Sequence, residues 1–293
     1  MPDTVERSAP SAPPRRPVTP VPAGKSGRSD PTMRFDIHAR LQHAMLALSL
    51  GVLMLTGFPI KYAHTAWAPA VVRLFGSFET MLRVHLLAAG LLAFVVVYHL
   101  VMCLWGLARR RLDFAVIPHL RDFVDFAHHL SYLAGFRPDP PRFGKFTWWE
   151  KFEYWAVVWG TTVMGVSGLT LAFPEWAAAY VPRWVIGALR VAHSNEALLA
   201  FLAVLIGHSF AVHFSPSVFP SSTVWYNGKL KLSQLLEDHA LLYESMAGCA
   251  VDDLDRVPHS RWAHNRVLIG LELVVYTGLV AWVFVSLVPL LPR

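Results

Sequence analysis

Histidines inside apolar segments are the residues of this sequence best suited to chemistry. His85 and His99 lie near the two ends of "VHLLAAGLLAFVVVYHL", residues 84–100. At 3.6 residues per turn, their fourteen-residue spacing puts them about 40° apart around a helix and about 21 Å apart along it. His193 and His208, fifteen residues apart in "AHSNEALLAFLAVLIGHSFAVHF", repeat the pattern. Each segment therefore presents histidines at two depths.

Matched depths on two helices suit the binding of an iron porphyrin. Two neutral imidazoles from facing helices can hold the iron, and the apolar ring replaces core side chains between them. Ala89, Gly90 and Ala200 are small enough to let the ring approach the backbone. A lone histidine in a membrane helix can serve packing or a proton relay, but ionisable groups there are costly and usually functional. We therefore expect these four histidines to bind haem b.

Two more histidines lie at the same end of the predicted helices as His99 and His208, which we call the inner level. His43 begins the first apolar segment, and His213 follows His208 by five residues, about 140° around the same helix. Depth favours inner ligation by His99 with His208, which would leave His43 to meet His213 at a third haem. Two haems are favoured over three, because each extra haem displaces packed side chains and His213 can instead cap the helix end. The predicted iron ligands are His43, His85, His99, His193, His208 and His213.

Composition identifies the surroundings of these segments as a bilayer. The chain is 54% hydrophobic and 16% charged, with a mean hydropathy of +0.40, far from the composition of a soluble domain. Five stretches have the length of about 20 residues that a transmembrane helix needs, namely 42–61, 83–107, 151–173, 193–213 and 267–290. We predict an all-α integral membrane protein with a haem-binding bundle of four transmembrane helices and a fifth, C-terminal transmembrane helix.

The distribution of charge and proline gives the domains and the topology. Lys and Arg gather in the tail and in the loops 107–150 and 214–266, whereas the intervening loops carry only Arg73, Arg183 and Arg190. By the positive-inside rule, the N-terminus lies inside and the C-terminus outside a bacterial cytoplasmic membrane. The predicted domains are a disordered cytoplasmic tail (1–33), the transmembrane haem-binding domain (34–230), a cytoplasmic polar region (231–266) and the C-terminal helix (267–293).

Two function classes are excluded from this chain. Its basic pI of about 9.5 follows from the cytoplasmic anchoring charges, so it does not indicate nucleic-acid binding. Cys103 and Cys249 are its two cysteines, and it has no CxxCH motif. Covalent haem c and iron–sulfur clusters are therefore excluded.

In the 107–150 loop, apolar residues at helical spacing predict a short helix at the membrane interface; they are Phe123, Phe126, Leu130 and Leu133.

Four segments carry a resemblance to a known family. They are "RLQHAMLALSLGVLMLTGFPIKY", "RVHLLAAGLLAFVVVYHL", "KFTWWEKFEYWAVVWGTTVMGVSGLTL" and "AHSNEALLAFLAVLIGHSFAVHFSPSVFP". Over residues 34–230 the chain resembles the prokaryotic cytochrome b family that includes the membrane subunits of formate dehydrogenase, nickel-iron hydrogenase and thiosulfate reductase. It is most similar to the branch that often accompanies multihaem c-type cytochromes.

The resemblance implies ligand pairs that differ from the depth argument. Similarity to formate dehydrogenase subunits implies His43 with His208 at the inner haem and His85 with His193 at the outer haem. The histidine spacings instead look like the cytochrome b of quinol:cytochrome c oxidoreductases, which implies His99 with His208. The two resemblances disagree at the inner level, and a third haem would reconcile them.

A ladder of haems across a membrane indicates electron transfer. We expect the electron-transfer subunit of a quinone-linked oxidoreductase, exchanging electrons between a quinone pool and a periplasmic or peripheral redox subunit, either a multihaem cytochrome c or a catalytic subunit. A proton-relay transporter or a structural anchor without haem are the alternatives. Quinone chemistry also needs proton-exchanging groups, for which the inner candidates are Glu150, Lys151, Glu153 and Tyr154, with His128 and His129 in the preceding loop.

Overall fold

The computed structural model describes residues 33–215, 217–219 and 221–247, together with residues 270, 274, 276–278 and 281 near the C-terminus. Within these residues the regular secondary structure is helical, with turns and loops between the helices and an isolated antiparallel bridge between Met33 and Lys229. Nearly all of the predicted N-terminal tail and most of the predicted C-terminal helix lie outside the described residues.

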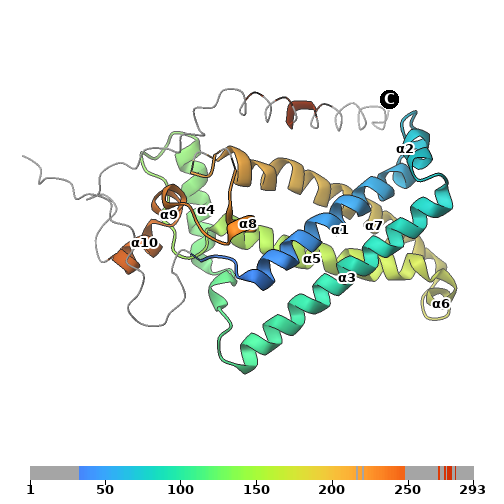
Figure 1. The fold of residues 1–293 in the computed structure, drawn as a ribbon, viewed down its shortest axis with the longest axis horizontal. Helices are drawn as coiled ribbons and strands as arrows, with labels where there is room; N and C mark the ends of the chain where they lie inside the picture. Colours follow the sequence, from blue (N-terminus) through green and yellow to red (C-terminus); the bar gives the residue numbers. More distant parts are fainter. Residues whose placement is uncertain are drawn as a thin grey trace, which may run out of the picture.

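Four long helical segments form the body of the protein (Figure 1). Each is long and apolar enough to cross a membrane: α1 (Ile37–Lys61), α3 (Phe78–Ala108), α5 (Trp148–Ala172) and the continuous segment Arg183–Phe214. The last segment consists of α7 (Arg183–Leu202) and two π-helical stretches, η2 (Ala203–His208) and η3 (Phe210–Phe214). The predicted all-α membrane bundle is confirmed.

Side-chain caps fix where the membrane-spanning helices begin. Asp36 accepts a hydrogen bond from the Ala39 amide ahead of α1, and Ser77 accepts one from the Thr80 amide ahead of α3. Thr147 and Glu150 cap α5 reciprocally, each side chain bonding the other residue's amide. Because polar caps satisfy amides that have no partner within the helix, these positions start the helices at the ends of the apolar runs.

The long helices pair as two hairpins. Helix α1 packs chiefly against α3, and α5 packs chiefly against α7. Small hydroxyl residues are fully buried in these pairs, namely Ser49, Thr56 and Ser167. Large apolar side chains such as Leu87 and Trp159 lie exposed on the outside, as expected of a surface that faces lipid rather than water.

Short helices close the two ends of the bundle (Figure 1). At one end lie α2 (Ala68–Leu74) and α6 (Pro174–Ala178). At the other end lie η1 (Phe114–Val116), α4 (Leu120–Leu133), α8 (Val224–Asn227), α9 (Leu232–Glu237) and α10 (Ala240–Ala247). The histidine-bearing helices are thus held between two caps.

Helix α4 is the short amphipathic helix that the sequence predicts. Its apolar side chains Phe123 and Leu133 are exposed, while its polar side contacts α5. There, Lys151 Nζ lies 2.8 Å from the Asp122 carboxylate, and Trp148 Nε1 donates to His129 Nδ1 at 3.2 Å. Its location at the membrane interface stays a prediction.

Helices α8, α9 and α10 share one small apolar core. Val224, Leu230, Leu235, Leu236 and Tyr243 are buried together, so this core continues across the predicted domain boundary at residue 230. Gly228 joins it to the start of α1, because its carbonyl accepts the amides of Arg34 and Phe35. Its φ is +79°, and a Cβ there would lie 2.2 Å from the Phe35 carbonyl oxygen, so only glycine fits.

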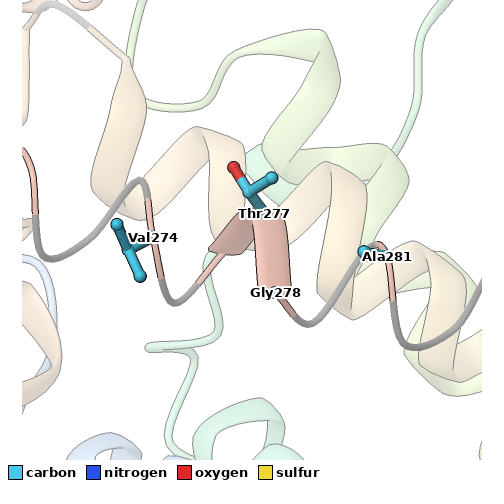
Figure 2. A pocket seen from close by; sticks show the side chains of 4 residues that line it. All are labelled: Val274, Thr277, Gly278 and Ala281. Atoms are coloured by element: carbon cyan, nitrogen blue, oxygen red, sulfur yellow. The ribbon is translucent and has the colours of Figure 1, made fainter.

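The described C-terminal residues include a shallow apolar pocket lined by Val274, Thr277, Gly278 and Ala281 (Figure 2). Nearby, the ring of Tyr276 lies 4.9 Å from the ring of Phe214 in η3. The lining residues carry no ionisable group and none of the candidate histidines, so the pocket plays no part in the site described next.

Candidate functional site

His85 in α3 is held by a hydroxyl group of α1. Its Nδ1 lies 2.8 Å from Thr56 Oγ1, and Thr56 in turn donates to the Val52 carbonyl at 2.7 Å. Because the hydroxyl proton is used in that bond, its oxygen accepts the Nδ1–H of His85. The lone pair of the neutral ring then lies on Nε2, the nitrogen available to a metal.

His193 in α7 is held in the same way by α5. Its Nδ1 lies 2.9 Å from Ser167 Oγ, which donates to the Val163 carbonyl at 2.6 Å. Ser167 therefore accepts the Nδ1–H, and Nε2 is again available as a ligand. His85 and His193 lie close enough to interact electrostatically. The structure thus brings together the two histidines predicted for the outer haem.

A glycine follows each of these hydroxyl residues and makes room for the imidazole. A Cβ at Gly57 would lie 3.2 Å from His85 Cε1, and a Cβ at Gly168 would lie 3.1 Å from His193 Cε1. The pattern is a hydroxyl residue followed by glycine, once in α1 and once in α5. These supporting residues were not predicted from the sequence, although the repeated pair near the predicted outer end of two apolar segments was a usable signal.

At the inner level, the structure brings His43 in α1 together with His208 in η2. Their ring centroids are 6.2 Å apart. Two metal–nitrogen bonds of about 2 Å each would span most of this separation, and the two ring radii account for the rest. His208 Nδ1 lies 3.3 Å from the carboxylate of Glu153, which holds that nitrogen as a donor. The pair therefore fits a bis-imidazole iron site.

The backbone beside His208 is closely covered by an aromatic ring. A Cβ at Gly207 would lie 2.9 Å from Trp149 Cζ2, so the Trp149 ring of α5 rests directly on this part of η2. The Nε1 of Trp149 is buried and has no hydrogen-bond partner within the described part of the chain. A buried donor of this kind beside the inner pair suits a polar group of a bound cofactor.

His99 contacts polar side chains rather than another histidine. Its Nδ1 lies 2.9 Å from Gln42 Oε1, and its Nε2 lies 3.0 Å from the Tyr154 hydroxyl and 3.4 Å from Cys103 Sγ. Both ring nitrogens are therefore hydrogen-bonded to side chains. The ring that neighbours His208 is His43, as the resemblance to formate dehydrogenase subunits implies and the depth argument does not.

His213 lies in η3, with its ring centroid 6.3 Å from that of Phe214. The ring contacts of the described residues join His208 to His43 rather than joining His43 to His213. The geometry thus forms two histidine pairs from four of the six candidates and places His99 and His213 outside both pairs.

The predicted proton-exchanging groups at the start of α5 have four separate partners. Glu150 pairs with Arg34 at 2.7 Å, and Lys151 pairs with Asp122. Glu153 bonds His208, whereas Tyr154 bonds His99. His128 and His129, which the structure places in α4, contact the Asp139 carbonyl and Trp148 instead. Glu153 and Tyr154 are therefore the members that reach the histidines of the membrane-spanning helices.

Partly buried Asp238 and buried His239 lie next to each other in the end cap, where His239 contacts the segment before α5; neither was predicted from the sequence. His239 is 1% exposed and its Nδ1 donates to the Gly144 carbonyl at 2.8 Å. Burial raises the pKa of the neighbouring Asp238 to about 6, against a hydrogen bond from Ser217 that lowers it. Burial lowers the pKa of His239. Burial therefore shifts the proton equilibrium of each group toward its neutral form.

Comparison with known protein families identifies the family of this chain. Residues 34–224, about two thirds of the chain, match the family described as prokaryotic cytochrome b561. No curated protein gives a match. The cytochrome b family expected from the sequence is confirmed. The chain therefore belongs to the prokaryotic cytochrome b561 family, as a multi-pass membrane b-type cytochrome that binds haem b and takes part in electron transfer.

Proposed function

We propose that this cytochrome carries electrons across the bacterial cytoplasmic membrane through two b haems. The outer haem is held by His85 and His193, and the inner haem by His43 and His208. The observation that carries the proposal is the meeting of these four histidines as two pairs at opposite ends of the bundle. Each bound haem supplies a reversible one-electron centre.

The supporting residues make each pair competent as a ligand set. Thr56, Ser167 and Glu153 each engage one Nδ1, which fixes the ring orientation and leaves Nε2 for the iron. The hydroxyl partners of the outer pair are neutral, whereas the Glu153 partner at the inner pair is a carboxylate. A carboxylate makes an imidazole a more basic ligand, so the inner haem has the lower reduction potential.

Two haems, rather than three, follow from how the remaining histidines are used. His208 already meets His43, and both nitrogens of His99 are bonded to side chains. A third haem would need His99 and His213 to leave these surroundings and would displace packed side chains. The proposed stoichiometry is therefore two haems per chain.

The two haems exchange electrons with different partners at opposite ends of the bundle. The positive-inside distribution of Lys and Arg supports a cytoplasmic location for the α4 end and a periplasmic location for the α2 and α6 end. The electron partners we propose are a quinone dissolved in the bilayer and a periplasmic redox subunit, either a multihaem cytochrome c or a catalytic subunit. The protein acts as the electron-transfer subunit of such a complex.

The visible absorption spectrum of the purified full-length protein tests this function. Reduction by dithionite should give the α-band of b haem, and pyridine haemochrome analysis should give about two haems per polypeptide. A preparation made with ample haem supply that stays colourless would instead support the anchor or proton-relay alternatives.

A further inference from the structure

Glu196 of α7 is a carboxylic acid in the apolar middle of the bundle, three residues after His193. A Cβ at Gly160 of α5 would lie 3.1 Å from Glu196 Oε1, so the carboxyl group rests against α5 at that glycine. The side chain is partly buried, and no residue in the described part of the chain forms a hydrogen bond or an ion pair with it. An acid without a partner thus lies between two membrane-spanning helices.

Gly160 lies halfway between the outer and inner histidine pairs. On α5, Ser167 bonds a histidine of the outer pair and Glu153 bonds a histidine of the inner pair. Gly160 is seven residues from each of them, which is about 10 Å along the helix and about 20° around it. All three therefore share one face of α5. Glu196 approaches this face between the two proposed haems.

The sequence around Glu196 holds no other ionisable group between the two histidine pairs. The stretches 44–60 of α1, 86–97 of α3, 155–172 of α5 and 197–207 beyond Glu196 contain no Asp, Glu, Lys, Arg, His, Cys or Tyr. The acid of α6, which also packs against α7, is exposed at the outer end. The ionisable groups that border these stretches are His43 and Lys61 in α1, His85 and Tyr98 in α3, Tyr154 in α5 and His208 in η2.

Polar side chains lie on the outer side of Glu196. Ser194 and Asn195 precede it directly, and Lys61 Nζ of α1 lies 3.0 Å from Ser194 Oγ and 2.9 Å from Asn195 Oδ1. On the inner side, residues 197–207 carry only apolar side chains and one glycine. A proton therefore reaches Glu196 more readily from the outer end of the bundle.

We propose that Glu196 exchanges a proton with the outer surface each time a neighbouring haem changes its redox state. Ionisable groups inside a membrane are costly, and they commonly mark paths of protons or ions. An electron added on either side of Glu196 makes its surroundings more negative, and at low dielectric this strongly favours protonation of a carboxylate. The inference rests on the proposed function, because it takes the two bound haems as the redox centres.

Each step exchanges one electron and one proton. The Glu196 carboxylate binds one proton from water at the outer end, forming an O–H bond, as one electron from the redox partner converts a ferric haem to the ferrous form. On reoxidation the O–H bond breaks and the proton returns to the outer end, while the electron leaves to a partner. The net charge in the middle of the bundle is therefore the same before and after each transfer.

The pH dependence of the haem potentials tests the proposal. Spectroelectrochemical titrations at a series of pH values use the full-length, haem-loaded protein in lipid nanodiscs. Uptake of one proton per electron changes the reduction equilibrium tenfold per pH unit, or about 59 mV. Wild-type midpoint potentials should therefore fall as pH rises, and in Glu196→Gln they should fall less steeply with both haems retained. Glu175→Gln, which changes the exposed acid of α6, should keep the wild-type slope.

Infrared difference spectra between the reduced and oxidised protein detect the proton itself. Reduction of the wild type should produce the C=O band of a protonated carboxylic acid, which shifts in deuterated water and is absent from Glu196→Gln. Gly160→Ala brings a Cβ against the carboxyl group and should move this band. Gly165→Ala, whose Cβ meets nothing within 4 Å, is the matched control and should leave the band in place.

The outcomes separate this inference from the function on which it rests. Wild-type protein that binds b haem but shows no such band would overturn the inference, whether or not the variants fold. A band and a pH slope in Glu196→Gln equal to those of the wild type would assign the proton to another group and would overturn it too. Both results leave the proposed function standing. Absence of b haem from the wild-type protein would instead defeat the proposed function itself.

Discussion

The hydroxyl of Thr56 in α1 lies 2.8 Å from Nδ1 of His85 in α3, which links the two helices of the first hairpin at a proposed iron ligand. The second hairpin repeats this relationship between Ser167 and His193 at 2.9 Å. Both hydroxyls are followed by a glycine that faces the imidazole. The two hairpins therefore hold the outer histidine pair with the same arrangement, a hydroxyl residue followed by a glycine.

Loss of either outer ligand should remove the same haem. In His85→Ala and in His193→Ala, one remaining imidazole leaves the iron without its second ligand, so haem content should fall from about two to about one per chain. Pyridine haemochrome analysis and the reduced α-band measure this. His64→Ala, at an exposed position of the outer loop, should leave haem content unchanged. Spectra showing that the two variants lose different haems would refute the pairing.

The glycines beside the outer histidines should be needed for the geometry of the outer haem. Gly57→Ala and Gly168→Ala each place a Cβ within about 3.2 Å of an imidazole carbon, so the ring must move. Electron paramagnetic resonance of the oxidised protein should show a shifted or weakened outer-haem signal and an unaltered inner one.

Two glycines of the same helices serve as controls for that experiment. A Cβ at Gly51 in α1 or at Gly165 in α5 meets nothing within 4 Å. Gly51→Ala and Gly165→Ala should therefore give the wild-type spectrum. A spectral change in these controls equal to that of Gly57→Ala would mean that helix packing, rather than contact with the imidazole, governs the signal.

The sequence predicts the membrane-spanning helices better than it predicts which individual side chains meet between them. Helical periodicity and hydropathy predict the four described membrane helices, because burial in lipid constrains every residue of a span. The spacing of His85 from His99 predicts two levels, yet His43 rather than His99 meets His208. Which of two histidines at one depth faces a partner depends on how the helices are rotated, and this rotation is set by packing between segments distant in sequence.

The residues that hydrogen-bond the histidines are harder to predict from the sequence than the histidines themselves. Thr56 and Ser167 are common residues in membrane helices, where their hydroxyls bond the preceding turn, so their type alone carries little information. Asp238, which is partly buried, and the buried His239 follow a short helix whose position depends on the small core around Leu235 and Tyr243. No periodic pattern in the sequence indicates that a polar loop folds back against α5.

Glu153 should lower the reduction potential of the inner haem. Its carboxylate lies 3.3 Å from His208 Nδ1 and makes this ligand more electron-donating, which stabilises ferric iron. In Glu153→Gln, the midpoint potential of the inner haem should rise by tens of millivolts, where about 59 mV corresponds to a tenfold change for a one-electron couple. Spectroelectrochemical titration measures it.

The outer haem gives an internal reference for that titration, since its potential should stay unchanged in Glu153→Gln. Glu175→Gln removes a carboxylate from exposed α6 at the opposite end of the bundle and should leave the inner potential unaltered. A shift of the inner potential to lower values in Glu153→Gln would contradict the assigned role of the carboxylate.

The end cap should become less stable as pH rises through the pKa of Asp238. Burial raises this pKa from 3.8 to about 6, so between these values the folded cap binds more protons than the unfolded cap. The contribution of Asp238 to the stability of the cap is therefore greatest below pH 3.8 and falls as pH rises to about 6, by about 3 kcal/mol as an upper bound. The lowered pKa of His239 acts oppositely, since its contribution is lost as pH falls below 6.5.

Substitution of Asp238 isolates its share of this pH dependence. Asp238→Asn should slow hydrogen exchange of the α9 and α10 amides at pH 7.5 relative to wild type, and this difference should shrink toward pH 5. The His239 contribution cancels in the comparison. Asp139→Asn, at an exposed loop position, should behave as wild type. Equal differences at both pH values would show that Asp238 titrates normally.

His213 should not be required for haem binding. It lies in η3, five residues beyond His208, and its ring packs beside Phe214, whose own ring contacts Tyr276 at 4.9 Å. Recruitment of His213 to a third iron would disturb this aromatic packing, which is favourable beyond the area it buries, and would need a partner other than His43. Wild-type protein should therefore contain about two haems per chain, and His213→Ala should contain the same number. Pyridine haemochrome analysis of both proteins decides the matter, because a wild-type ratio near three that falls to near two in His213→Ala would establish the third haem.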